Sequence, residues 1–151
     1  MNVSRIRPGM CPPGAARTAW PPDPSSGGSS SVSAGATALG MGDIALGTDP
    51  AGSGRVPAAL NGIFGVKPTF GLIPTTGVVP ACRTIDCVTV FARDLSDARA
   101  AAELMAGPDG IDPLGREDRP APPLDARPRV AVPTSEHLEG LAIHDEHTRR
   151  P

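Results

Sequence analysis

GGSSSVSAGATALGMGDIALGTDPAGSGRVP, residues 27–57, is the stretch that decides the fold of this chain. Its alanine-rich first part favours a helix, residues 44–46 favour a short apolar strand, and a glycine-rich turn follows. Glycines flank Ser53, and glycine permits the positive φ angles of a turn whose backbone approaches a ligand closely. Because Val56-Pro57 can begin a helix, we expect Ser53 at a helix N-terminus, where free N–H groups stabilise a developing negative charge.

Three motifs, GGSSS, GTDPAGSGRVPA and GVKPTFGLIPTTG, occur in the order and with the spacing of the amidase signature family, which this chain resembles from residue 24 to the mid-130s. Within that family, VVPACRTIDCVTVFARDLSDA is most similar to the allophanate hydrolases, which split a urea-derived amide. The resemblance implies an α/β protein: a partial amidase signature fold, with a mixed β-sheet core and surrounding helices, truncated at both ends.

The resemblance also implies the catalytic groups, position by position. Ser53 matches the nucleophile, and Ser29 matches the cis-serine that relays its proton. The backbone N–H groups of Ala51, Gly52 and Ser53 match the oxyanion hole. Pro50, at the start of that segment, has no N–H to donate.

The third member of the family's triad is a lysine upstream of the glycine-serine motif, and it has no counterpart here. Lys67, the single lysine of the sequence, matches a family position outside the triad. Val32 stands where the family has glycine, and Phe70 replaces an arginine. Since a serine hydroxyl needs a neighbouring base to become nucleophilic, we expect the chain to be inactive alone.

Three functional hypotheses remain open. The first is an amidase-type hydrolase fragment of allophanate hydrolase type, acting on a small-molecule amide by Ser–cisSer–Lys chemistry without metal or organic cofactor. The second is a fragment of another enzyme of the family, either a general amidase or the amide-hydrolysing component of a glutamyl-tRNA amidotransferase. The third is a non-catalytic, degenerate remnant.

Composition excludes other classes of partner. The net charge of −2 gives no electrostatic basis for binding nucleic acid or an anionic membrane. No apolar run approaches the ~20 residues of a membrane span. Three cysteines without a signal peptide indicate reduced thiols and a cytoplasmic location. The oligomeric state is not indicated.

The distribution of proline and glycine divides the chain. Residues 1–24 lack periodicity and are expected to be disordered. Residues 25–106 form the amidase signature core segment, and residues 107–128, with six prolines, form a linker. Residues 129–151 begin a truncated C-terminal part, in which RVAV at 129–132 predicts a strand.

Two elements of the core segment are predicted most clearly. CVTVFA at residues 87–92 is apolar and β-branched, which predicts a buried strand. Asp94 is expected to cap a helix that ends at Gly107-Pro108. A shorter helix is expected to end near Asn61-Gly62. The apolar stripe of the long helix comprises Leu95, Ala98, Ala102 and Met105.

Two pairs of side chains beside these elements have a functional and a plain interpretation. Asp49 and Arg55 flank the Ser53 turn and either pair to hold it or are separately solvated. Cys82 and Cys87 lack the second pair of ligands of a metal site and are expected to be buried free thiols. His144 and His147 are expected to be solvated on a polar tail.

Overall fold

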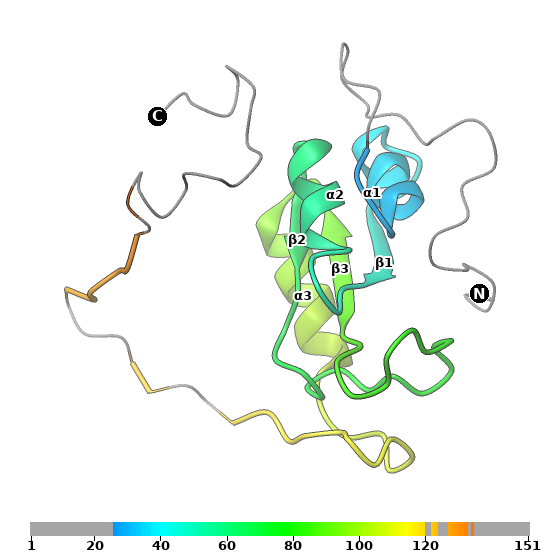
Figure 1. Cartoon of the computed structure of the whole chain (residues 1–151), viewed down its shortest axis with the longest axis vertical. Helices are drawn as coiled ribbons and strands as arrows, with labels where there is room; N and C mark the ends of the chain where they lie inside the picture. The colour runs from blue at the N-terminus through cyan, green and yellow to red at the C-terminus, as the bar shows by residue number, and fades with distance from the viewer. Residues whose placement is uncertain (1–25, 120–121, 124–126, 133, 135–151) are drawn as a thin grey trace. The chain divides into compact units, whose positions relative to one another are not determined.

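The computed structural model describes residues 26–119, 122–123, 127–132 and 134 (Figure 1). The chain divides after residue 119 into two units, and every helix and strand of the described residues lies in the first. In chain order these elements are α1 (Ser31–Ala38), β1 (Ile44–Thr48), α2 (Arg55–Leu60), β2 (Phe64–Val66), β3 (Val88–Ala92) and α3 (Leu95–Met105).

The three strands form one sheet in the order β1-β3-β2. Both outer strands pair antiparallel with β3, with Thr48 opposite Val88 and Val66 opposite Val90. Because β1 and β2 are both antiparallel to the strand between them, they run in the same direction. Their C-terminal ends therefore lie at the same edge of the sheet, and the segments that follow them begin there.

The predicted buried strand is the centre of the fold. All five residues of β3 are buried. Phe91 packs with Ala34 of α1 and Ala58 of α2, whereas Val90 and Ala92, the residues on either side of it, pack against α3. Since successive strand residues point to opposite faces, the sheet lies between α1 and α2 on one side and α3 on the other (Figure 1). The α/β fold class is confirmed, with antiparallel pairing throughout the described strands.

Helix α3 begins where the sequence predicts. The Asp94 carboxylate accepts the Ser96 N–H at 2.8 Å, which satisfies one of the donors left free in the first turn. The apolar stripe is correct except at its start, because Leu95 is 46% exposed. The side chains that pack on the sheet are Ala98, Ala101, Ala102 and Met105.

Helix α2 also ends as predicted, with Asn61 as its C-cap and Gly62 at φ +65°. Its start differs, because the helix begins at Arg55 and Pro57 is its third residue instead of its first. Proline is tolerated there because the N–H groups of the first turn have no acceptor within the helix.

The first half of the expected linker packs onto this unit. Residues 107–119, which we call the Asp112 loop, hydrogen-bond to the turns after β2: Gly107 N–H donates to Leu72 O, and Arg116 N–H donates to Gly71 O, both at 2.8 Å. In the second unit, residues 129–132 lie outside any strand, contrary to prediction. The expectations for residues 1–24 and for His144 and His147 concern positions outside the described residues.

Candidate active site

A backbone hydrogen bond joins the two serine segments. The Ser30 N–H donates to Ser53 O at 3.1 Å, which brings Ser29 and Ser53 together from 24 residues apart. Both serines are half-buried. The peptide bond between Gly28 and Ser29 is cis. Ser30 itself is buried, and its Oγ exchanges hydrogen bonds with the N–H and C=O of Thr48, each at 3.2 Å.

The Ser53 turn, residues 49–55, is held by the carboxylate of Asp49. This side chain is fully buried and accepts hydrogen bonds from the N–H groups of Gly52 and Arg55 and from the Arg55 guanidinium. Its ion pair with Arg55 Nε measures 2.9 Å. One carboxylate thus fixes the backbone on both sides of Ser53. The predicted Asp49–Arg55 pair is confirmed, and the alternative of two solvated charges is wrong.

The hydrogen bonds around Asp49 set its protonation. Burial acts to raise the pKa of Asp49, but the hydrogen bonds from Arg55 and Gly52 outweigh it and lower that pKa to about 2. The carboxylate is therefore ionised at neutral pH. Because the Arg55 side chain is 55% exposed, the positive partner of this buried anion faces solvent.

The hydrogen bonds also change what the predicted oxyanion hole can offer. Gly52, with φ +118°, directs its N–H to Asp49 Oδ1. Among the residues that the structure describes, nothing accepts from the N–H of Ala51 or of Ser53. The oxyanion-hole assignment stays a prediction. The geometry leaves the backbone N–H groups of Ala51 and Ser53 as the candidate donors of this predicted oxyanion hole.

The Ser53 turn lies directly against the sheet, and this contact explains why residue 54 is a glycine. From the sequence, the glycines beside Ser53 were attributed to positive φ angles. Gly54 has φ −101°, an ordinary value for any residue, and is the N-cap of α2. A Cβ atom at this position would lie 2.7 Å from Thr89 Cγ2 of β3. Close packing requires the glycine here. Thr89 is itself fully buried, and its Oγ1 has no hydrogen-bond partner among the described residues.

Sequence reasoning missed the roles of Ser30 and Thr89. Ser30 was visible as one of three consecutive serines, but its bond to β1 depends on a contact 18 residues away. The alternation of VTVFA places Thr89 on the same face as Phe91, and this pattern could have indicated a small polar group facing the turn.

Lys67 does not take the place of the missing base. Its Nζ donates to Pro68 O at 3.3 Å, and the buried Cys87 thiol donates to the same carbonyl at 3.3 Å. Burial raises the pKa of Cys87, and the nearby Lys67 ammonium opposes that rise.

Cys82 is exposed, contrary to prediction. It lies in a turn whose N–H groups at Ala81 and Cys82 both bond Asp86, and its side chain faces outward.

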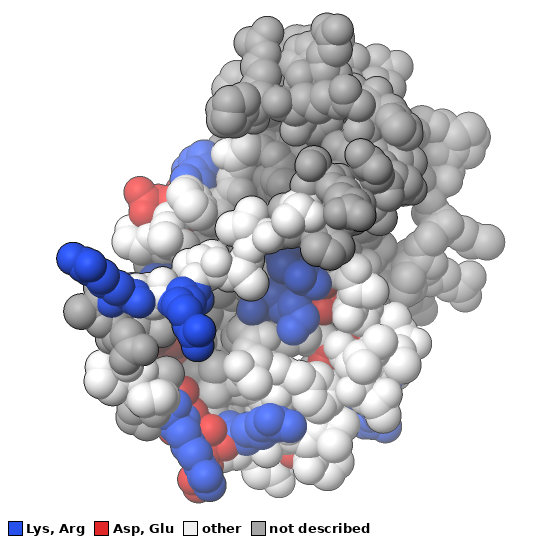
Figure 2. Space-filling view, turned by 60° about the vertical axis from the view of Figure 1, so that its left-hand side comes forward, with Lys and Arg blue, Asp and Glu red and all other residues white. Residues whose placement is uncertain are grey.

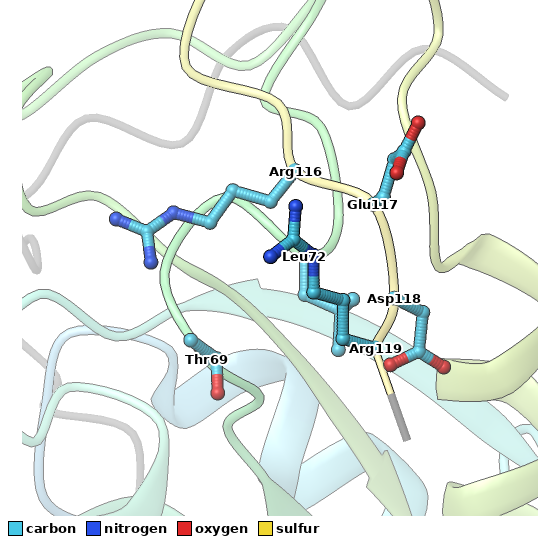
Figure 3. Close-up of a pocket in the computed structure, with 6 residues that line it drawn as sticks. All are labelled: Thr69, Leu72, Arg116, Glu117, Asp118 and Arg119. Carbon is cyan, nitrogen blue, oxygen red and sulfur yellow. The ribbon is translucent and has the colours of Figure 1, made fainter. Parts of the chain in front are cut away.

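A pocket of about 620 Å³ lies beside the turn that follows β2 (Figure 3). We call it the Arg116 pocket, and its lining residues are Thr69, Leu72, Arg116, Glu117, Asp118 and Arg119. None of them was singled out from the sequence.

Elsewhere, basic side chains are scattered over the face shown in Figure 2 instead of forming one patch. Within residues 26–119 and the shorter described stretches, no three His, Cys, Asp or Glu side chains are placed to hold a metal ion. None of the helices described is long and apolar enough to cross a membrane.

Comparison with known proteins identifies the class. The family model of the amidases, described as Amidase, matches residues 7–144. This match covers most of the chain, and the chain belongs to the amidase family.

Within that family, urea amidolyases and allophanate hydrolase are prominent relatives. The chain is 52% identical over 111 residues to a urea amidolyase of Lachancea kluyveri, covering 72% of this chain and 6% of that protein. A crystal structure of Kluyveromyces lactis allophanate hydrolase superposes with TM-score 0.59 and 52% identity, covering 63% of this chain and 16% of that one. A component of the glutamyl-tRNA(Gln) amidotransferase of Symbiobacterium thermophilum is 46% identical over 99 residues, covering 66% of this chain and 20% of that protein.

The chain therefore resembles allophanate hydrolase over the part that both share. It spans only 6% of the length of that urea amidolyase. The similarity establishes the family and the local fold, and the activity of a whole enzyme is a separate question.

Proposed function

We propose that this chain carries the nucleophile-bearing part of a serine amidase site. The hydrogen bond from Ser30 N–H to Ser53 O is the observation that carries the proposal, because it places Ser29 beside the nucleophile turn. Ser53 Oγ attacks the amide carbon while its proton passes to Ser29. Collapse of the tetrahedral intermediate expels the amine with a proton and leaves an acyl-enzyme, which water hydrolyses to regenerate Ser53.

The oxyanion of that intermediate would be held by the Ala51 and Ser53 N–H groups. Two other positions in the segment contribute nothing, because Pro50 has no N–H and Gly52 donates to Asp49. Loss of one oxyanion-hole donor costs on the order of 100- to 1,000-fold in turnover. We therefore expect a working version of this site to depend strongly on both remaining amides.

Turnover requires a base at the serines, and the described part of the chain places no lysine there. The single lysine donates to Pro68 instead. In the proposed mechanism the base is the family's upstream lysine, and the chain alone is expected not to turn over. We expect the substrate to be a small urea-derived amide, since both urea amidolyase and allophanate hydrolase match at 52% identity. A cytoplasmic location remains a prediction.

A chimera tests the proposal directly. Residues 26–119 would replace the matching segment of K. lactis allophanate hydrolase, so that the host supplies the upstream lysine. We expect hydrolysis of allophanate by the chimera, and a loss on the order of 1,000-fold or more in Ser53→Ala. Ser29→Ala should lose about 100-fold or more, because proton transfer by a positioned group contributes at least that much.

Ser33→Ala is the matched control, since this serine lies on the neighbouring helix α1. It should leave kcat unchanged. Full activity of the Ser53→Ala chimera would overturn the proposal. Turnover of glutaminyl or simple amides in preference to allophanate would instead favour the amidotransferase or general amidase alternative, and the 46% identity to the Symbiobacterium protein supports the first of these.

Labelling with a fluorophosphonate probe tests the chain by itself. We expect no Ser53-dependent labelling, because no base activates its hydroxyl. Labelling that disappears in Ser53→Ala would show that the isolated site is activated by another group, and the proposed need for the upstream lysine would then be wrong.

A further inference from the structure

The Arg116 pocket is lined by two segments that lie far apart in the sequence. Thr69 and Leu72 come from the turns after β2, and residues 116–119 come from the end of the Asp112 loop. In Figure 3, the side chains of Arg116 and Arg119 extend over the space beside Thr69 and Leu72, whereas Glu117 and Asp118 point away from it. All four charged residues line the pocket, and in this view the two basic side chains are the ones that extend toward Thr69 and Leu72.

The backbone that carries Arg116 is held in place. Its N–H donates to Gly71 O at 2.8 Å. Gly71 has φ +80°, and a Cβ atom there would lie only 2.3 Å from Leu114 O, so the two segments approach as closely as glycine allows. Asp112 Oδ2 accepts the N–H and the hydroxyl of Thr75 at 2.7 and 2.8 Å. These bonds fix the loop before any ligand arrives.

Arg55, Arg93 and Arg99 of this unit form ion pairs, whereas Arg83, Arg116 and Arg119 form none with a described residue. Arg93 pairs with Asp43 at 2.9 Å, and Arg99 pairs with Glu103 at 3.2 Å. Neither Arg116 nor Arg119 forms an ion pair with any residue in the described ranges. No described residue takes up their donors in an ion pair, and a guanidinium presents planar N–H pairs that match the oxygens of carboxylate and phosphate groups.

We infer that the Arg116 pocket binds a small oxyanion with two negative charges, held between the guanidinium groups of Arg116 and Arg119. The volume of about 620 Å³ is ample for such a molecule. Phosphate and dicarboxylate ligands share this chemistry. The inference does not depend on the chemistry of Ser53. Two lining residues of the pocket, Thr69 and Leu72, follow the C-terminal end of β2, and β1 ends at the same edge of the sheet, where the Ser53 turn begins.

Titration of the 151-residue chain with inorganic phosphate or with malonate, followed by the NMR signals of the arginine side-chain Nε–H groups, tests the inference. We expect saturable shifts at Arg116 and Arg119, weakening as salt is added because both groups are exposed. Arg116→Gln/Arg119→Gln should weaken binding by about 10-fold or more, the loss that corresponds to about 1.4 kcal/mol. Sodium chloride at equal ionic strength is the reference titration.

Arg83→Gln/Arg99→Gln is the matched control, because it removes the same charge from two exposed arginines outside the pocket. It should bind as the unaltered chain does. Saturation by phosphate alone or by malonate alone would support the site and identify which source of oxyanion it accepts. Equal weakening in both double variants, or no saturable shift with either anion, would overturn the inference.

Discussion

The Ser53 turn and the Asp112 loop are both organised by aspartates that accept backbone N–H groups, and they differ in burial. Asp49 is fully buried and bonds two backbone N–H groups and a guanidinium. Asp112 is only partly buried and bonds Thr75 and Leu114. An aspartate that accepts backbone N–H groups therefore contributes differently to stability in the two regions. A buried carboxylate loses its hydration and depends wholly on its partners, whereas water can replace the partners of an exposed one.

Replacing Asp49 should have the largest effect on stability. Asp49→Ala removes the acceptor of two backbone N–H groups and of Arg55, and we expect it to lower the free energy of unfolding by about 3 kcal/mol. Urea denaturation measures this. Asp43→Ala, at an exposed carboxylate paired with Arg93, is the control and should cost less than about 1 kcal/mol. Equal costs would show that burial does not distinguish the two pairs.

Lowering the pH should remove the contribution of the Asp49 carboxylate to stability. The pKa of Asp49 is about 2 in the folded chain and about 3.9 in an unfolded one, so its contribution to stability is present above pH 4 and is lost as pH falls toward 2. The shift corresponds to about 3 kcal/mol. Urea denaturation between pH 2 and 5 should show this slope.

Asp94, Asp109 and Asp112 also have lowered pKa values, because hydrogen bonds with Ser96, Thr76 and Thr75 respectively favour their ionised forms. They add to the acid slope in the same direction. Comparison with Asp49→Asn therefore isolates the contribution of Asp49. An unchanged slope in that variant would contradict the assignment.

Two glycine-to-alanine substitutions test whether close packing fixes the Ser53 turn. In Gly54→Ala, the added Cβ would collide with Thr89, and we expect a loss of about 1–3 kcal/mol in the free energy of unfolding. Gly35→Ala is the matched substitution in α1, where the nearest atom would be 4.0 Å away, and it should stabilise the chain by up to about 1 kcal/mol. Thermal unfolding of the two variants should shift in opposite directions.

The smallest effect is expected in the Asp112 loop. Asp112→Ala removes the acceptor of the Thr75 N–H and hydroxyl, and amide hydrogen exchange at Gly107 and Arg116 should accelerate while β3 stays protected. Asp118→Ala is the control, because Asp118 bonds no residue in the described part of the chain. Acceleration throughout β3 would show that the loop and the sheet unfold as one unit.

The sequence predicted correctly the features that depend on contacts between residues close together in the chain. It missed features that depend on contacts between distant segments. The cap of α3 at Asp94 and the end of α2 at Asn61 are set by neighbouring residues, and both were predicted correctly. The exposure of Leu95 and Cys82 was missed because burial depends on which elements pack nearby. The docking of residues 107–119 was missed as well, since proline content gave no sign of the contacts made by Asp112.

By itself, the sequence determined the family, the order of the core elements, and Ser53 and Ser29 as the catalytic candidates, because motifs and short-range propensities are written along the chain. Only the tertiary structure decided that Asp49 occupies the Gly52 N–H, that Gly54 is needed for contact with Thr89, and that Arg116 and Arg119 border one pocket. Each of these depends on the direction in which a group points once distant segments meet. A linear pattern does not contain that direction.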